Sequence, residues 1–154
     1  MVNIQMPRDA ILLPREQCRF YLLTFPGLTQ KEAAAALEFR LPEVYPGSLD
    51  AVTLDFRLLK YKGGKDRGKK GETSILALVV EKKFLNDFLK NHPEKRPYVP
   101  LFHLLDAATF KAGDSVSISC SCSSQDSSAI RDTLSCSRGG TWEYSRENIS
   151  QPHP

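Results

Sequence analysis

The chain has no apolar run that approaches the roughly 18 residues needed for a membrane-spanning helix. Its first apolar stretch, residues 10–13, is also too short for the core of a secretory signal. Charged residues stand on both sides of that stretch: Arg8, Asp9, Arg15 and Glu16. We therefore expect a cytoplasmic protein, and any membrane role is expected to be peripheral.

Cysteine is also scarce, with 4 among 154 residues. Because no export signal is visible, we expect reduced thiols rather than disulfide bonds. Cys120, Cys122 and Cys136, together with His153, offer side chains that can ligate a metal. The single residue between Cys120 and Cys122 is a shorter spacer than common zinc sites use, and the serine-rich flanks provide no rigid cage. The sequence therefore predicts no metal and no cofactor.

Motifs for catalysis and nucleotide binding are missing. The glycines of residues 60–71 do not fit the Gly-x-x-x-x-Gly-Lys-Ser/Thr pattern of a phosphate-binding loop. No Gly-x-Ser-x-Gly elbow accompanies the many serines. His103 lies close to Asp106 in the sequence, but such a pair is more typical of a surface or core edge than of a catalytic dyad. We expect that the protein is not an enzyme.

Positive charge is concentrated in one segment. The net charge is only +3, but residues 60–71 carry six basic side chains and one acidic one, which leaves −2 for the rest of the chain. The basic residues are Lys60, Lys62, Lys65, Arg67, Lys69 and Lys70. Such a loop either binds an anionic partner, such as lipid headgroups, an acidic protein segment or a phosphate backbone, or is a solvated hairpin tip that keeps the protein soluble.

The first regular elements are a strand and a helix. Residues 19–25 are rich in β-formers and end at Pro26-Gly27. Thr29 and Glu32 form a capping box that predicts a helix start, and Leu28 is placed to act as a hydrophobic staple. The helix body has one apolar face and ends or kinks near Pro42. That face carries Leu37, Leu41 and Val44.

Two strands, a helix and a last strand are expected next. Residues 52–59 alternate apolar and polar side chains, as in a strand with one wet face. Residues 74–80 are almost continuously apolar and predict an inner strand. Residues 82–91 form an amphipathic helix, and 98–105 predict a strand at a sheet edge because of Pro100.

The element order is β-α-β-β-α-β, which predicts an α+β sandwich with both helices on one face of an antiparallel sheet. This domain covers residues 18–112, after an N-terminal segment of residues 1–17. Residues 113–154 are rich in serine and predict either a partial β-hairpin or a disordered tail. Within that tail, residues 116–122 predict a weak strand, and Gly139-Gly140 predicts a turn before a short strand at residues 141–146.

Three short motifs resemble a known family. Residues 23–32, 44–46 and 52–56 are similar to the PilM family, the actin-like type IV pilus assembly proteins, which are related to the L protein of type II secretion. The likeness covers residues 11–95 and implies a ferredoxin-like inserted subdomain of an incomplete actin-like fold. Residues 139–146 resemble the hairpin that opens the other half of that fold.

The resemblance also implies what is missing. No Asp-x-Gly phosphate motif stands near the N-terminus, and residues 120–124 lack the aspartate and glycine of the second phosphate motif. The resemblance therefore implies a degenerate ATPase fold that does not bind ATP. It predicts a non-catalytic scaffold domain that binds other proteins of a type IV pilus or type II secretion assembly platform at the inner membrane.

The predicted binding surfaces are a sheet edge, the groove beside the first helix and the basic loop. The residues assigned to them are Leu37, Phe39, Leu41, Tyr45, Lys62, Lys65, Arg67, Lys69 and Lys70. Either the loop meets an anionic membrane surface, or it serves an alternative function as part of a nucleic-acid-binding α+β module. RNA-binding sheets of this kind expose aromatic side chains, whereas residues 75–80 are aliphatic, so nucleic acid is not expected. Trp142 and Tyr144 are either interface anchors or core residues.

Overall fold

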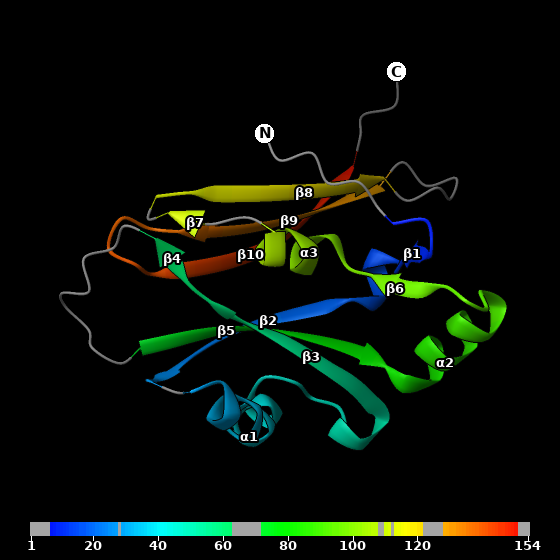
Figure 1. Ribbon diagram of the computed structural model, residues 1–154, viewed down its shortest axis with the longest axis horizontal. Helices are drawn as coiled ribbons and strands as arrows, with labels where there is room; N and C mark the ends of the chain where they lie inside the picture. Colours follow the sequence, from blue (N-terminus) through cyan, green and yellow to red (C-terminus); the bar gives the residue numbers. More distant parts are fainter. Residues whose placement is uncertain are drawn as a thin grey trace. The chain divides into compact units, whose positions relative to one another are not determined.

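The computed structural model describes residues 7–27, 29–62, 72–107, 110–111, 113–121 and 128–150. The protein is of mixed α+β type, and its chain divides into two units. Unit 1 comprises Met1–Lys60 and Asp66–Ala108, and unit 2 comprises Tyr61–Lys65 and Thr109–Pro154. Figure 1 labels the elements of both units along the chain.

Unit 1 contains all three described α-helices and most of the short elements. Its elements are β1 (Ala10–Leu12), η1 (Arg15–Gln17), β2 (Arg19–Pro26), α1 (Gln30–Arg40), η2 (Leu41–Glu43), η3 (Leu49–Ala51), β3 (Val52–Leu59), β5 (Glu72–Glu81), α2 (Lys82–Asn91), β6 (Arg96–Tyr98) and α3 (Pro100–Ala107). The elements of unit 2 are β4 (Tyr61–Lys62), β7 (Phe110–Lys111), β8 (Ser115–Ser121), β9 (Ser128–Cys136) and β10 (Trp142–Ser150).

The main sheet of unit 1 has the strand order β2-β5-β3, with antiparallel pairing throughout. β5 is the middle strand and is buried on both faces, as its continuous apolar sequence predicts. Its buried residues are Ile75, Leu76, Ala77, Leu78, Val79 and Val80. The predicted alternation of β3 is confirmed in part: Val52 lies in the core and Thr53 and Asp55 are exposed, but Arg57 is half-buried and Leu59 is buried.

Helix α1 begins at the predicted capping box. The Thr29 hydroxyl accepts a hydrogen bond from the Glu32 amide at 3.4 Å, and the Glu32 carboxylate accepts one from the Thr29 amide at 3.3 Å. The predicted staple residue, Leu28, lies outside the described residues. The helix ends at Arg40 and passes into η2, whose second residue is Pro42.

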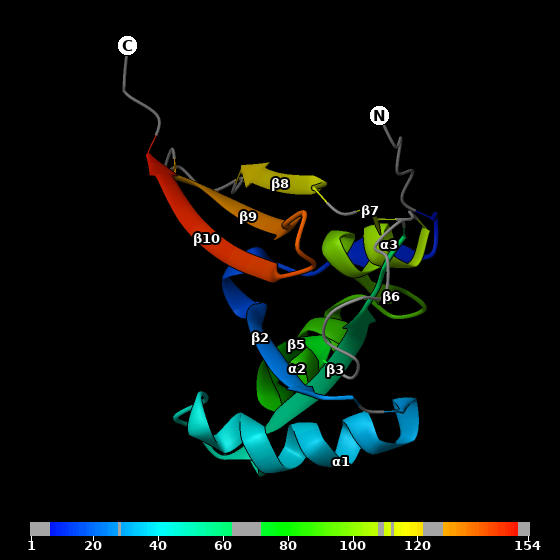
Figure 2. The same cartoon turned by 90° about the vertical axis from the view of Figure 1, so that its left-hand side faces the viewer.

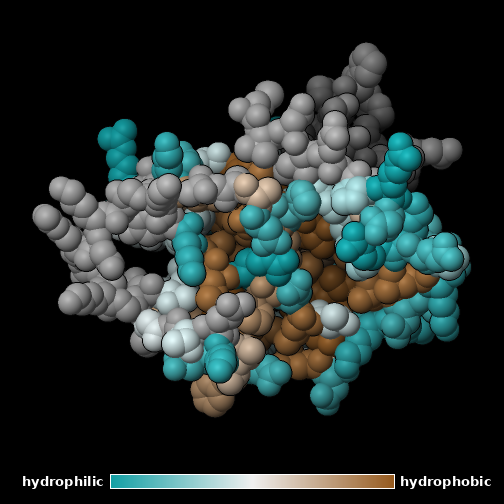
Figure 3. All heavy atoms as spheres, in the orientation of Figure 1, coloured by the Kyte–Doolittle hydropathy of each residue, from teal (hydrophilic) through white to brown (hydrophobic). Residues whose placement is uncertain are grey.

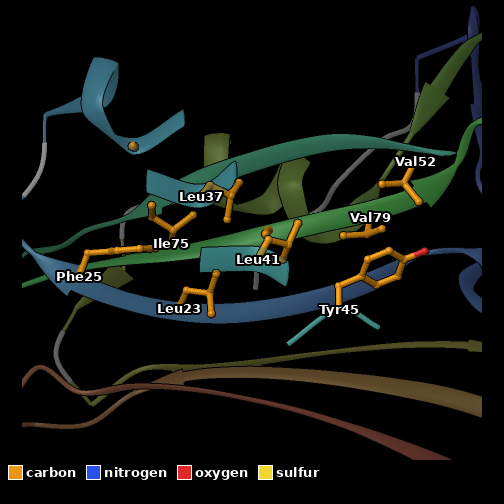
Figure 4. Packing of buried hydrophobic residues seen from close by; sticks show 10 residues of the cluster. Leu23, Phe25, Leu37, Leu41, Tyr45, Val52, Ile75 and Val79 are labelled. Carbon is orange, nitrogen blue, oxygen red and sulfur yellow. The ribbon is translucent and has the colours of Figure 1, made fainter. Parts of the chain in front are cut away.

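The core of unit 1 lies between α1 and the sheet. Figure 4 shows side chains from the helix and from η2 lying against the strands, and those side chains are almost fully buried. The cluster comprises Leu23, Phe25, Ala33, Leu37, Leu41, Tyr45, Val52, Ile75, Ala77 and Val79. Complete burial of one large apolar side chain contributes about 1.5–3 kcal/mol, so this cluster contributes strongly to the stability of the unit.

The opposite face of the sheet is covered by α3. Phe102 of α3 packs edge-on against Phe20 of β2, with ring centroids 5.7 Å apart. Figure 2 shows α1 and α3 on opposite sides of the strands. Helix α2 differs from the prediction, because none of its residues is buried. Its apolar side chains are only half-buried, and Figure 3 shows a hydrophobic strip among hydrophilic residues in the region of α2.

The prediction of a strand at residues 98–105 is wrong. Tyr98 ends the three-residue strand β6, which pairs in parallel with β1 away from the main sheet, and Pro100 is the first residue of α3. A proline suits the first turn of a helix, because its missing N–H would have no partner there. In the described part of the chain the main sheet therefore has three strands, and the fourth strand of the predicted order is not in it.

Unit 2 contains a three-stranded antiparallel sheet with the order β10-β9-β8, and a short parallel pair, β4-β7. The predicted strands at residues 116–122 and 141–146 correspond to β8 and β10, and β9 between them was not predicted. The turn before β10 uses Gly140 at a positive φ of 87°, a conformation that favours glycine. The predicted disordered end, residues 151–154, lies outside the described residues.

Candidate protein-binding edge

The main sheet of unit 1 ends in two outer strands, β2 and β3 (Figure 1). The N–H and C=O groups on the outer side of such a strand can pair with another chain, and proteins usually block them. The two outer strands of this sheet differ in that respect.

The outer edge of β3 is occupied by its own side chains. The backbone N–H of Phe56 donates to the Asp55 carboxylate at 2.9 Å, and the backbone carbonyl of Phe56 accepts from the Arg57 guanidinium at 3.0 Å. Both backbone groups of Phe56 therefore point away from β5, and both are already satisfied.

Arg57 is held in this position by several contacts. Its Nε donates to Oδ1 of Asp106 at 2.8 Å and its Nη2 to Oδ2 at 3.1 Å, a bidentate pair that ties β3 to α3. Its guanidinium carbon lies 4.6 Å from the centroid of the Phe102 ring, and its Nη1 lies 3.2 Å from Asp55. The hydrogen bond to Asp106 raises the pKa of Arg57 above its usual value. This network occupies the outward backbone groups of Phe56, in the middle of β3, and so hinders strand addition at that point of the edge.

The pairing on β3 fixes which groups of β2 face outward. Phe56 lies opposite Ala77 of β5, and Ala77 lies opposite Tyr21 of β2. Because Phe56 turns its backbone away from β5, Ala77 directs its own N–H and C=O to Tyr21. Antiparallel pairs alternate, so Leu22 and Thr24 direct their N–H and C=O groups to the outer edge.

Within the part of unit 1 that the structure describes, no side chain bonds to the outer edge of β2 as Asp55 and Arg57 bond to that of β3. Residues 20–25 contain no charge, proline or glycine. Leu22 is half-buried and Thr24 is exposed. Arg19, at the start of the strand, is exposed, and no ion pair joins it to a carboxylate within the described ranges. Among the described residues of unit 1, side chains therefore occupy one edge of the main sheet, and no comparable contacts occupy the other.

The structure separates the residues predicted to line the groove beside the first helix. Leu37 and Leu41 are buried in the core and Tyr45 is nearly so, with its ring 6.2 Å from that of Tyr21. These three residues hold the helix on the sheet and have no surface to offer a partner. Phe39 points the other way and is 79% exposed.

Of the predicted basic loop, only its first residues are described. Lys62 ends β4 in unit 2, and the orientation of its side chain is not described. Lys65, Arg67, Lys69 and Lys70 lie outside the described residues. The accessible edge of β2 was predicted only as an unspecified sheet edge. Its signal in the sequence is the uncharged run at residues 20–25, in contrast to the Asp55-Phe56-Arg57 triplet of the other outer strand.

Of the candidate metal ligands, Cys122 and His153 lie outside the described residues, and the side chain of Cys120 is not described. Cys18 and Cys136 are buried thiols outside any disulfide, and burial raises the pKa of the Cys136 thiol. Within the described ranges, no three His, Cys, Asp or Glu side chains form a metal-binding group. Asp106 pairs with Arg57 and not with His103, whose ring lies 5.1 Å from that of Tyr98.

Unit 2 contains a buried polar cluster. Asp132 of β9 is fully buried and accepts hydrogen bonds from the Tyr144 hydroxyl at 2.7 Å and from Nε of Arg146 at 2.7 Å. Burial and this hydrogen bond raise the pKa of Tyr144. Trp142 is also buried, with its ring 5.4 Å from that of Phe110, so it is a core residue. The cluster joins β9 to β10.

Among the helices that the structure describes, none is long and apolar enough to cross a membrane. The chain matches no family model, no curated protein and no solved structure. The resemblance to the PilM family therefore stays a prediction from the sequence.

Proposed function

We propose that this protein is a non-catalytic binding module that takes up an extended segment of another protein along the outer edge of β2. The observation that carries this proposal is the difference between the two edges of one sheet. The Asp55–Arg57–Asp106 network occupies the middle of the edge of β3, whereas Leu22 and Thr24 direct backbone groups outward from the uncharged run of residues 20–25. Strand addition is a common mode of peptide recognition, in which backbone hydrogen bonds provide affinity.

The strand order supports the same edge. In a ferredoxin-like β-α-β-β-α-β fold the fourth strand pairs with the first, on the side away from the third. Here β2, β3 and β5 take the places of the first three strands, and the residues expected to form the fourth fold into α3 instead. We extend the proposal accordingly: unit 1 is a ferredoxin-like domain, and a partner supplies the strand beside β2.

The wider context of the proposal comes from the sequence. The motifs at residues 23–32 and 52–56 favour a scaffold of a type IV pilus or type II secretion assembly platform. Each backbone hydrogen bond contributes about 0.5–1.5 kcal/mol net, and Leu22 and Thr24 together offer two donors and two acceptors. Such an edge alone gives weak, reversible binding, which suits a scaffold with exchanging partners.

The proposal is tested by site-specific cross-linking in the cells that make the protein. A photoreactive amino acid replaces Thr24 on the accessible edge or, as a matched control, Thr53 on the blocked edge; both residues are exposed. We expect a discrete cross-linked partner from position 24 and little from position 53.

A second variant tests whether the partner pairs with the backbone. Leu22→Pro removes an outward N–H and leaves the ladder to β5 intact, so the sheet should fold while strand addition is lost. Circular dichroism checks the fold. Equal cross-linking from positions 24 and 53, or cross-linking that survives Leu22→Pro in a folded protein, would contradict the proposal.

A further inference from the structure

We infer that the segment bound at β2 carries an acidic residue, two apolar residues and a second acidic residue at alternate positions, in the pattern Glu-x-Val-x-Val-x-Glu or its chemical equivalent. This inference rests on the proposed function, because it names the chemistry of the partner at the same edge. It follows from the side chains that β2 presents on the face covered by α1.

Alternate residues of β2 lie on that face. Tyr21, Leu23 and Phe25 all pack against the core beneath α1, and by alternation Arg19 lies on the same side. A guest strand runs about 4.8 Å from β2, so every second guest side chain lies beside one of these four residues. From Arg19 to Phe25, this face of β2 therefore presents a cation, an aromatic, an aliphatic and a second aromatic side chain in that order.

The middle of this row favours apolar guest side chains. Tyr21 is only half-buried, although its ring meets that of Tyr45, and Leu23 beside it is buried. A guest residue beside Tyr21 therefore covers apolar surface that is accessible in the free protein. Aliphatic and aromatic cross-strand neighbours are the pairs that stabilise such sheets.

Both ends of the row favour acidic guest side chains. Arg19 is exposed and makes no ion pair within the part of the chain that the structure describes, so a guest carboxylate gives it a partner. At the other end the Arg40 guanidinium carbon lies 5.4 Å from the centroid of the Phe25 ring. Arg40 also pairs with Glu43 at 3.1 Å, and a guest carboxylate must compete with that pair. The Arg19 end therefore contributes most of the charge selectivity.

The spacing of the two cations defines the pattern. Arg40 lies over Phe25, and Phe25 is six positions after Arg19, which corresponds to about 20 Å along an extended strand. Guest carboxylates must therefore stand six residues apart, with the two apolar residues between them. The pattern reads the same in both directions, so it holds for parallel and antiparallel addition.

The test uses two fluorescein-labelled peptides, Glu-Thr-Val-Thr-Val-Thr-Glu and Lys-Thr-Val-Thr-Val-Thr-Lys, and measures their binding to the full chain by fluorescence anisotropy. We expect the acidic peptide to bind the wild-type protein about tenfold more tightly, because two favourable cross-strand charge pairs replace two unfavourable ones. This preference should shrink in high salt, since exposed charges are screened.

Three variants locate the binding. Arg19→Glu should abolish or reverse the preference, because the Arg19 end supplies most of the selectivity and a glutamate there repels the acidic peptide and attracts the basic one. Lys31→Glu makes the same change of charge at an exposed position of α1 and should leave the preference unchanged. Leu22→Pro should abolish binding of both peptides.

The outcomes separate this inference from the proposed function. Equal affinity for both peptides, lost in Leu22→Pro, overturns the inference and leaves strand addition at β2 standing. The inference is also overturned if neither labelled peptide binds at protein concentrations up to about 1 mM, where weak complexes are still detected. In that case the cross-linking experiment alone decides the proposed function. Acidic-peptide binding that persists in a folded Leu22→Pro protein overturns both.

Discussion

The orientation of α1 can be tested by two alanine substitutions two residues apart. Leu37 is 1% exposed and Phe39 is 79% exposed, although both are large apolar residues of the same helix. Leu37→Ala removes three buried carbons, which corresponds to about 2.4 kcal/mol at about 0.8 kcal/mol per carbon. The cavity that remains raises the expected loss in unfolding free energy to about 3–5 kcal/mol. Phe39→Ala removes more atoms from a solvated position, so its effect should stay within about 0.5 kcal/mol.

The assay has to report on unit 1 alone. All described helices belong to unit 1, so urea unfolding followed by the helical circular dichroism signal monitors that unit. If Leu37→Ala unfolds the unit outright, Leu37→Met supplies a milder change that should cost less than about 1.5 kcal/mol. A loss for Phe39→Ala as large as that for Leu37→Ala would refute the packing of α1 on the sheet, and with it the assignment of Leu37 to the core.

Four further predictions concern single contacts. Thr29→Ala should lower the unfolding free energy of unit 1 by about 1 kcal/mol through loss of the helix cap, whereas Thr29→Ser should keep it; equal losses would contradict this. Asp132→Ala removes the acceptor of the three hydrogen bonds from Tyr144 and Arg146 and should cost unit 2 about 3–5 kcal/mol in unfolding followed by Trp142 fluorescence; a loss below about 1 kcal/mol would refute it. The raised pKa of Tyr144 means that the folded protein keeps a proton that the unfolded chain releases near pH 10. The stability of unit 2 should therefore be insensitive to this group below about pH 10 and fall above it, and Tyr144→Phe should flatten the fall; an unchanged slope would count against this cause. Asp55→Ala removes the acceptor of the Phe56 N–H and should raise concentration-dependent association in light scattering above that of the wild type.

Much of unit 1 follows from local sequence signals. The capping box at Thr29 and Glu32 acts through bonds three residues apart, so the start of α1 is visible in the sequence alone. Residues 52–59 alternate with a period of two because one face of β3 is more buried than the other. Residues 74–80 are continuously apolar because β5 is buried on both faces. The predicted bounds of β3 and α2 agree with the structure for the same reason.

Residues 98–105 show where local signals are ambiguous. Pro100 fits both an edge strand and the first turn of a helix, and the apolar residues after it fit both periods. In α3 they bury Leu101, Phe102 and Leu104, whereas Asp106 turns to Arg57 of β3. That partner lies 49 residues away in the sequence. A contact of this range leaves no local pattern, so the helix could not be distinguished from a strand.

Strand β9 was missed because a charged residue occupies a core position. Ile130, Leu134 and Cys136 are buried, but Asp132 stands between them in the row of alternate residues. Its charge breaks the alternation that marks a strand, and bonds from β10, a separate strand, help to explain how it is buried. The sequence also did not identify the edge of β2. Whether a strand lies at the edge of a sheet depends on the order of the other strands, which no local pattern in that strand reveals.

The middle position of β5 has a consequence for synthesis on the ribosome. β2 and β3 do not pair with each other, so neither has its sheet partner until β5 has been made. β2 is complete at Pro26 and β5 at Glu81, and the 55 residues between them take about 3–11 s at about 5–20 residues per second. For those seconds the nascent chain carries the apolar run at residues 20–25 as a lone strand. A chaperone that captures short extended apolar segments should meet this protein first at β2, before any folded partner does.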